Sequence, residues 1–186
     1  NFFLINLKSI GFPGILAAIF YTFANIMFVH AFANTTVANA LFTLSAIPFI
    51  TAILAFYFLD ENLSIRTIII MVIAFAGIVL MISEGLALGE FFGNIMALGT
   101  ALFFSCFAIT LRKFRKLDML PTLLIAGLMV SWITLIMTYN FIKIPVNEMF
   151  LCFIWGGVLS GVVNYIFIYA TRYLYASSVT FFMLFE

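Results

Sequence analysis

The chain has 186 residues, of which 66% are apolar and 8% carry a formal charge, for a net charge of +1 at pH 7. A soluble domain carries about 25% charged residues, so this chain lacks the polar side chains that would cover its surface in water. The composition excludes a soluble globular protein and predicts that lipid surrounds most of the chain. The sequence also has no basic surface of the kind that binds nucleic acid.

Runs without Asp, Glu, Lys or Arg divide the chain into membrane spans. Residues 9–59 form the longest run. Because roughly 20 helical residues cross a bilayer core, this run predicts two helices with a turn at Asn34-Thr35-Thr36. The predicted spans cover residues 10–33, 37–59, 65–83, 92–111, 122–142 and 149–171, and a seventh begins near residue 177. The runs are continuously apolar, so the expected fold class is all-α, a polytopic transmembrane helical bundle.

The two ends of the sequence indicate a fragment of a longer protein. The chain begins at Asn1 with no signal-peptide pattern. Its last apolar run starts after Arg172 and reaches Glu186, which is too short to complete a span. We therefore expect further helices beyond both ends.

Basic residues are distributed unequally between the two sides of the predicted bundle. Since consecutive loops alternate sides, one side holds Lys8, Arg66, Arg112, Lys113, Arg115, Lys116 and Arg172. The other side holds Lys143 alone. Short loops rich in Lys and Arg stay in the cytoplasm, so the loop at residues 112–118 is predicted to be cytoplasmic.

An internal repeat relates the first predicted span to the sixth. An offset of 139 residues sets residues 10–47 on residues 149–186, and pairs Asn25 with Asn164. The shift from the first span to the sixth is odd, so the second copy is expected to be inserted upside down. Inverted repeats of this kind build many secondary transporters around a site near the membrane midplane.

Small residues mark two helix faces for close packing. Gly93, Ala97 and Ala101 form one ridge, and Gly157 with Gly161 forms a GxxxG pair. Small residues at this spacing let membrane helices approach each other closely. Both faces are therefore expected at contacts between helices.

Several segments resemble the EamA-type family of the drug/metabolite transporter superfamily. They are residues 31–41 followed by Pro48 and residues 60–64, then residues 93–113, and then residues 170–178 followed by Glu186. The first group is similar to the third and fourth helices of that family, the second to its sixth helix, and the third to the repeat of the first motif.

The resemblance implies ten helices in two inverted five-helix repeats, of which this chain carries about six and a half. Residues 1–86 would hold helices 3–5 of the first repeat, and residues 87–186 would hold helices 6–9 of the second. Both termini would be cytoplasmic, around a central cavity that opens alternately to each side. Nucleotide-sugar and triose-phosphate carriers share these motifs, so the resemblance identifies the superfamily and no substrate.

Two asparagines inside predicted spans are candidates for lining a substrate cavity. Tyr21 and Phe28 share the helical face of Asn25, and Ser160 shares that of Asn164. Amides and aromatic rings near the midplane would suit zwitterionic or amphipathic metabolites. The alternative is that each amide only bonds a neighbouring helix, a contact that stabilises membrane bundles by about 0.6 kcal/mol.

Glu186 and Pro48 complete the set of candidate residues. Glu186 falls near mid-depth of the last predicted span, where a carboxylate is costly unless it is paired or protonated. It is a candidate proton carrier or substrate anchor, or a structural carboxyl. Pro48 removes a backbone hydrogen bond within its span, which makes it a candidate gating hinge or a static kink.

The leading hypothesis is a secondary transporter that exports small organic metabolites (amino acids, related metabolites or drugs) across a bacterial inner membrane. The sequence has no GxxxxGKS or GxxxxGKT phosphate loop, so an ion gradient or the substrate's own gradient would supply the energy. The expected partners are this substrate and the lipid bilayer, and the sequence leaves a homodimer open.

Three other classes of function compete with this hypothesis. The protein could be a non-transporting membrane scaffold or assembly subunit, a channel, or a membrane-embedded enzyme, which would need a nucleophile and a base at membrane depth. No cofactor and no metal are expected, because Cys106 and Cys152 lie in apolar runs without the spacing of metal ligands.

Overall fold

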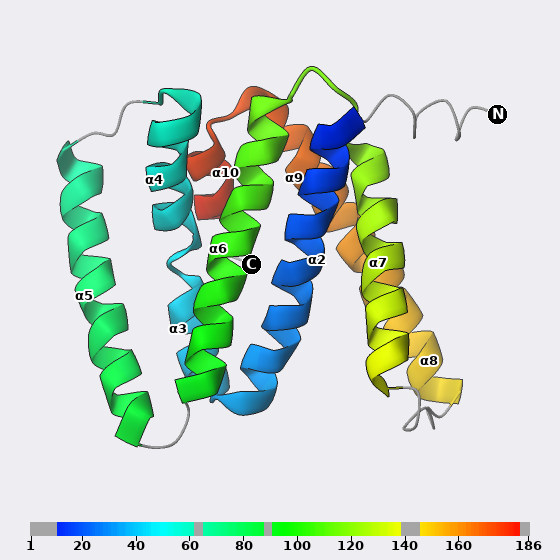
Figure 1. Ribbon diagram of the computed structural model, residues 1–186, viewed down its shortest axis with the longest axis horizontal. Helices are drawn as coiled ribbons and strands as arrows, with labels where there is room; N and C mark the ends of the chain where they lie inside the picture. Colours follow the sequence, from blue (N-terminus) through cyan, green and yellow to red (C-terminus); the bar gives the residue numbers. More distant parts are fainter. Residues whose placement is uncertain (1–10, 62–64, 88–90, 139–145, 183–186) are drawn as a thin grey trace.

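Helices make up nearly all of residues 11–61, 65–87, 91–138 and 146–182, which are the residues that the structure, a computed structural model, describes (Figure 1). They are α2 (Gly11–Asn34), α3 (Val37–Leu44), α4 (Ile47–Leu59), α5 (Ile65–Ala87), α6 (Phe91–Lys113), α7 (Leu120–Thr138), α8 (Val146–Cys152), the π-helix η2 (Phe153–Leu159), α9 (Ser160–Tyr173) and α10 (Ala176–Phe182). The predicted all-α, polytopic bundle is confirmed.

Five stretches of helix are long and apolar enough to cross a membrane. They cover Gly11–Asn34, Val37–Leu59, Phe91–Lys113, Leu120–Thr138 and Glu148–Tyr173. Each begins within a few residues of a predicted span, and α5 occupies the position of the predicted third span. The predicted end of the fifth span, residues 139–142, lies outside the described residues.

The predicted span over residues 37–59 is confirmed as one apolar stretch, and it is interrupted between α3 and α4. α3 ends at Leu44 and α4 begins at Ile47, with Pro48 in the first turn of α4. The proline ring has no N–H and clashes with the carbonyl four residues earlier, which is that of Leu44. The break therefore falls at the residue whose helical hydrogen bond Pro48 removes.

The predicted span over residues 149–171 is also not a uniform α-helix, because η2 separates α8 from α9. The N–H of Ser160 donates to the carbonyl oxygen of Trp155, five residues earlier, which is the bonding pattern of a π-helix. η2 contains Gly156 and Gly157, and glycine weakens the preference for α-helix.

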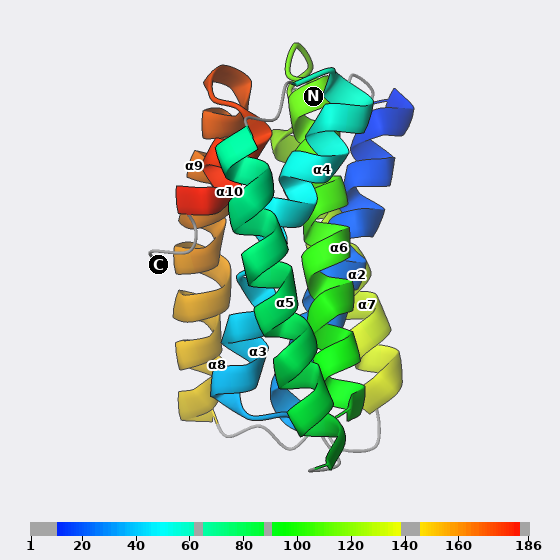
Figure 2. The same ribbon diagram turned by 90° about the vertical axis from the view of Figure 1, so that its left-hand side faces the viewer.

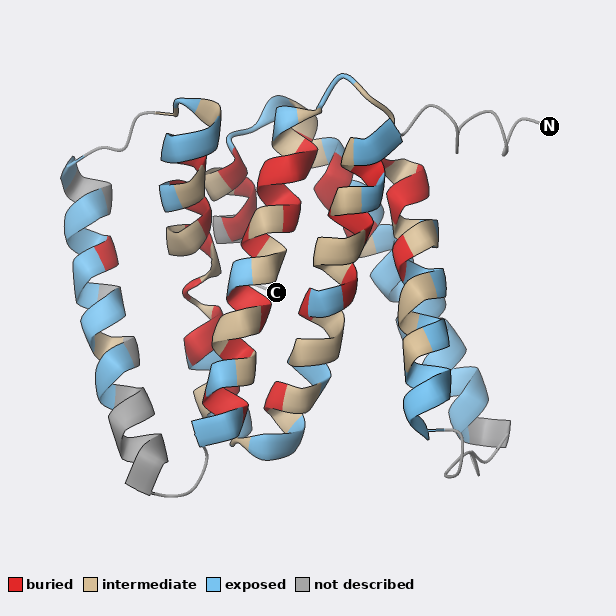
Figure 3. Ribbon diagram, in the orientation of Figure 1, coloured by how far each residue is buried: buried red, intermediate tan, exposed pale blue. Residues whose placement is uncertain are grey.

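α2 and α6 pack antiparallel at the centre of the bundle. Gly93, in the first turn of α6, lies so close to the last residue of α2 that a Cβ atom there would stand 2.5 Å from the carbonyl carbon and oxygen of Asn34. Towards the other end of the pair, the ring centroids of Phe107 and Tyr21 are 4.8 Å apart. Buried residues concentrate on α6 and on the faces of α2 and α4 beside it (Figure 3).

The remaining helices surround this central pair. α7 packs on α2, α4 packs on both α6 and α10, and α9 contacts α6 and α7. α5 lies at the edge of the bundle (Figures 1 and 2). The C-terminal ends of α4, α6 and α9 and the N-terminal ends of α5 and α7 meet at one end of the bundle (Figure 1), which we call the basic end.

The structure supports only one of the two predicted packing faces of small residues. Ala97 and Ala101 are fully buried, and Gly93 makes the close approach to α2, so this ridge is confirmed as a packing face. At Gly157 and Gly161, no described residue of another helix lies within 4 Å of an added Cβ atom. Among the described residues the GxxxG pair has no partner helix, so this expectation stays a prediction.

We expect Gly93→Ala to destabilise the bundle by about 1–3 kcal/mol, because the new methyl group would overlap the backbone of Asn34. The matched control is Gly127→Ala, where nothing lies within 4 Å of the added carbon. Thermal unfolding of the purified protein followed by size-exclusion chromatography measures both. Equal midpoints for the two variants would contradict the close approach.

Candidate functional site

Four of the predicted cavity residues lie together between α2 and α9. The side chains of Asn25, Ser160 and Asn164 lie close enough to the Tyr21 hydroxyl to affect it electrostatically. The Asn25 amide donates to the carbonyl oxygen of Tyr21 at 2.8 Å, and the Asn164 amide donates to that of Ser160 at 2.8 Å. An Asn side chain has two N–H donors and an acceptor oxygen, so each amide keeps capacity for a further partner. We call these four residues the polar cluster.

Aromatic rings from α6 and α9 lie beside the polar cluster. The rings of Phe107 and Phe167 are stacked with centroids 6.1 Å apart, and those of Phe104 and Phe167 are 5.3 Å apart. Phe107 also contacts the Tyr21 ring and is fully buried. The cluster thus combines hydrogen-bonding groups with aromatic faces contributed by three helices.

The other predicted site residues lie elsewhere. Phe28 is exposed and pairs with Phe32 at a centroid distance of 4.6 Å, so it does not join the polar cluster. Pro48 is buried at the break between α3 and α4. Glu186 lies outside the described residues.

A polar contact that sequence analysis did not single out joins α4 to α6 beside the break. The Thr51 hydroxyl donates to the hydroxyl oxygen of Ser105 at 3.0 Å. The Ser105 hydroxyl lies 2.7 Å from the carbonyl oxygen of Ala101 and 3.1 Å from that of Ile47, the residue before Pro48. Because both hydroxyl residues are fully buried, this contact holds the start of α4 firmly against α6.

A cavity of about 720 Å³ opens at the basic end, where α4 and α6 end and α10 begins. Its charged lining consists of Asp60, Glu61, Arg112, Lys113 and Arg115. None of the polar cluster lines it. The sequence analysis treated these charges as loop residues that set topology, since nothing in their spacing shows that they share a cavity.

Arg112 connects three elements at this cavity. Its Nε lies 3.5 Å from Oε1 of Glu61, which follows α4. Its Nη1 donates to the carbonyl oxygens of Thr171 and Arg172 at the end of α9, at 3.2 and 3.1 Å, and the guanidinium faces the Tyr175 ring. Burial raises the pKa of the Glu61 carboxyl, and the charge of Arg112 offsets this effect only in part.

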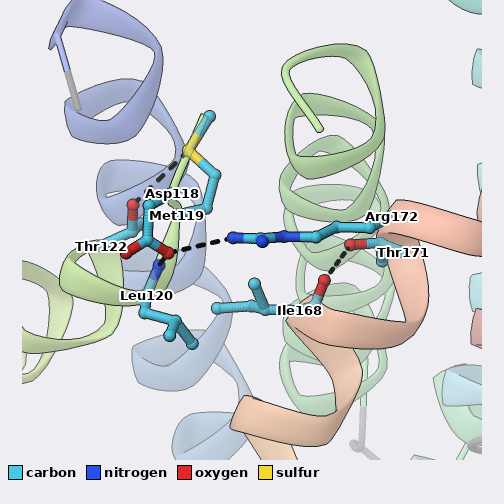
Figure 4. Close-up of polar contacts among 7 residues, drawn as sticks. All are labelled: Asp118, Met119, Leu120, Thr122, Ile168, Thr171 and Arg172. Atoms are coloured by element: carbon cyan, nitrogen blue, oxygen red, sulfur yellow. Dashed lines mark hydrogen bonds and ion pairs between the residues drawn. The ribbon is translucent and has the colours of Figure 1, made fainter. Parts of the chain in front are cut away.

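A second ion pair joins α9 to the start of α7 at the same end (Figure 4). Arg172 donates from Nη2 to Oδ1 of Asp118 at 3.0 Å, and the same oxygen accepts the N–H of Leu120 at 3.4 Å. The two charged side chains are 33% and 41% exposed. Exposed pairs of this kind contribute at most about 1 kcal/mol, so this contact orients the loop more than it stabilises the bundle.

We expect Phe107→Ala to lower stability by roughly 2–3 kcal/mol, chiefly through the cavity that it leaves, since lipid supplies little hydrophobic driving force between helices. Phe28→Ala removes the same atoms from an exposed position and should change stability little. Thermal unfolding in one lipid mixture compares the two variants. Similar losses in both would contradict the aromatic packing described above.

The described site supplies binding groups. Hydroxyls, amides and rings gather in the polar cluster, and charged groups gather in the cavity at the basic end. Among the described residues, no group of three His, Cys, Asp or Glu side chains could hold a metal ion. Cys106 and Cys152 are free thiols.

Comparison with known proteins gives one family match, in the first part of the chain. Residues 2–83 match the model of the EamA-like transporter family, a region that includes α2, the broken span and most of α5. Neither the curated proteins nor the solved structures gave a match. Members of the EamA family are transporters rather than enzymes. The chain is therefore a multi-pass membrane protein, and its residues 2–83 are similar to the EamA-like transporter family.

Proposed function

We propose that this protein is a secondary transporter that exports small organic metabolites, such as amino acids, related metabolites or drugs, across a bacterial inner membrane. The polar cluster is the observation that carries the proposal. A single amide is enough to join two helices, whereas four polar side chains at one place in a membrane are costly and typically mark a solute pathway. Amides and hydroxyls beside aromatic faces fit amphipathic and zwitterionic solutes.

Alternating access in this proposal rests on two inverted repeats. The offset of 139 residues that pairs Asn25 with Asn164 also sets the ends of α2 and α9 on each other, and likewise the starts of α3 and α10. Equivalent hydrogen bonds form at the C-terminal ends of α2 and α9. The Thr35 N–H donates to the Ala31 carbonyl oxygen and the Leu174 N–H to that of Ala170, each at 3.0 Å. These correspondences support a repeat in which residues 1–86 and 87–186 belong to different copies.

The proposed orientation places the basic end in the cytoplasm. Arg112, Lys113, Arg115 and Lys116 follow one another where α6 ends, and Arg172 lies beside them at the end of α9. Lys and Arg in short loops are retained on the cytoplasmic side. Solutes to be exported would then enter from the end that holds the 720 Å³ cavity.

We expect Asn25→Ala and Asn164→Ala to reduce efflux roughly tenfold, since hydrogen bonds within a binding site contribute about 1.5 kcal/mol. The full-length protein is reconstituted into vesicles loaded with a metabolite extract, and efflux is followed by mass spectrometry. Asn34→Ala is the matched control, because its exposed amide makes the same bond to the preceding turn, 2.8 Å from the His30 carbonyl oxygen.

Two outcomes of this assay would contradict the proposal. Efflux that is unchanged in both asparagine variants would leave the polar cluster as a packing contact. Wild-type protein that releases no metabolite from any extract would favour the scaffold alternative.

Orientation has a separate test in a variant that lacks Cys106 and Cys152. We expect a membrane-impermeant maleimide to label Lys116→Cys in inside-out vesicles and not in right-side-out vesicles. Asn34→Cys, which is exposed at the opposite end of the bundle, should show the reverse pattern. The opposite result for the two positions would invert the proposed topology.

A further inference from the structure

We propose that the cavity at the basic end is a carboxylate-binding site, in which the carboxylate of a small organic anion replaces Glu61 on the guanidinium of Arg112. A cytoplasmic solute would meet this site first, so the inference rests on the transport function proposed above. It narrows the substrate class of that function to organic monoanions with an apolar body.

The charges of the cavity favour a monoanion. Its lining has three cations, Arg112, Lys113 and Arg115, and two carboxylates, Asp60 and Glu61. Among the described residues of the lining, one positive charge is therefore left without a counter-charge. A single carboxylate balances that charge, and a cation would add to it.

Arg112 is held ready to receive the carboxylate. Its side chain is 12% exposed, and its two bonds to the carbonyl oxygens at the end of α9 and its contact with the Tyr175 ring fix the guanidinium plane. Such preorganisation reduces the entropy that binding would otherwise cost. Arginine is also the side chain whose planar N–H groups best match a carboxylate.

Glu61 is a replaceable partner for Arg112. Their contact of 3.5 Å is longer than the roughly 2.7–2.9 Å of a well-formed bond between a cationic N–H and a carboxylate. The pKa of Glu61 is raised because burial outweighs the attraction of Arg112. A carboxylate on a mobile solute can approach the guanidinium more closely than Glu61 does, and Glu61 can then turn towards water.

The rest of the cavity suits the body of such a solute. Phe58, Leu59 and Tyr175 supply apolar surface, and Ser177 and Ser178 supply hydroxyl groups. A volume of about 720 Å³ lies within the roughly 300–1,000 Å³ of small-molecule sites. An aromatic or aliphatic carboxylate would place its charge on Arg112 and its body against these side chains.

The test uses the full-length protein with Cys106 and Cys152 replaced and Ser177→Cys introduced, in nanodiscs of phosphatidylcholine. N-ethylmaleimide labels the new thiol, and 3-phenylpropionate is the probe. We expect the probe to slow labelling and its neutral amide to have no effect. Arg112→Gln should weaken protection roughly tenfold, whereas Glu61→Gln should strengthen it, because the competing carboxylate is gone.

Lys116→Gln is the matched control, since it removes a cation from the same loop that does not line the cavity, and it should leave protection unchanged. Weaker or unchanged protection in Glu61→Gln would overturn the proposal, as would equal protection by the amide. Phosphatidylglycerol that protects the thiol in place of the probe would assign the cavity to lipid headgroups and also overturn it. The efflux assay is separate: protection without efflux upholds the site and refutes transport, and efflux without protection refutes the site alone.

Discussion

Close contact between α2 and α6 is the interaction on which the rest of the bundle depends. Inside a bilayer, lipid chains are as apolar as side chains, so helices associate through packing and hydrogen bonds. Gly93 lets α6 reach the backbone of α2 at one end of this pair, and Phe107 meets Tyr21 towards the other. The fully buried Ala97 and Ala101 lie between these two points along α6. Two points of contact far apart fix both the separation and the rotation of the two helices.

That fixed pair positions both polar sites. Rotation of α2 determines where Tyr21 and Asn25 point, and rotation of α6 determines where Phe107 and Arg112 point. α9 is then bound at two levels, through Phe167 against α6 and through its last carbonyl groups on Arg112. The polar cluster and the cavity at the basic end are therefore linked: α6 places Phe107 beside the cluster and Arg112 in the cavity, and α9 contacts both of these residues. Movement of α9 relative to α6 would alter both sites.

Much of the fold followed from the sequence, because charge-free runs and lipid thickness determine helix number and approximate ends. The proximity of Tyr21 and Asn25 to Ser160 and Asn164 could also be predicted from the sequence. An amide in an apolar span is uncommon, and the helical period shows which residues share its face. Phe28 shares the helical face of Asn25 but lies about one turn further along α2, where it is exposed and pairs with Phe32.

Other features depend on contacts between helices that no single segment encodes. Thr51 and Ser105 are two of many hydroxyl residues in apolar runs, and only the packing of α4 on α6 brings them together. Likewise, only the packing of the helices brings Asn94, fully buried at the start of α6, to the Thr35 hydroxyl, from which it accepts a hydrogen bond at 3.0 Å. The break at Leu44 could be predicted from Pro48 alone, because proline removes the helical hydrogen bond to the carbonyl four residues earlier.

The π-helix η2 affects how this span tolerates changes in length. A π turn holds about one residue more than an α-helical turn of similar height, so side chains before it are rotated by about 100° from a continuous α-helix. Deleting one residue within Phe153–Leu159 would restore regular α-helix and leave α8 on nearly the same face, while α9 keeps its contacts. All seven residues of η2 lie outside the core, so a single-residue deletion is absorbed there at little cost. The same deletion in α6 would rotate Arg112 away from α9.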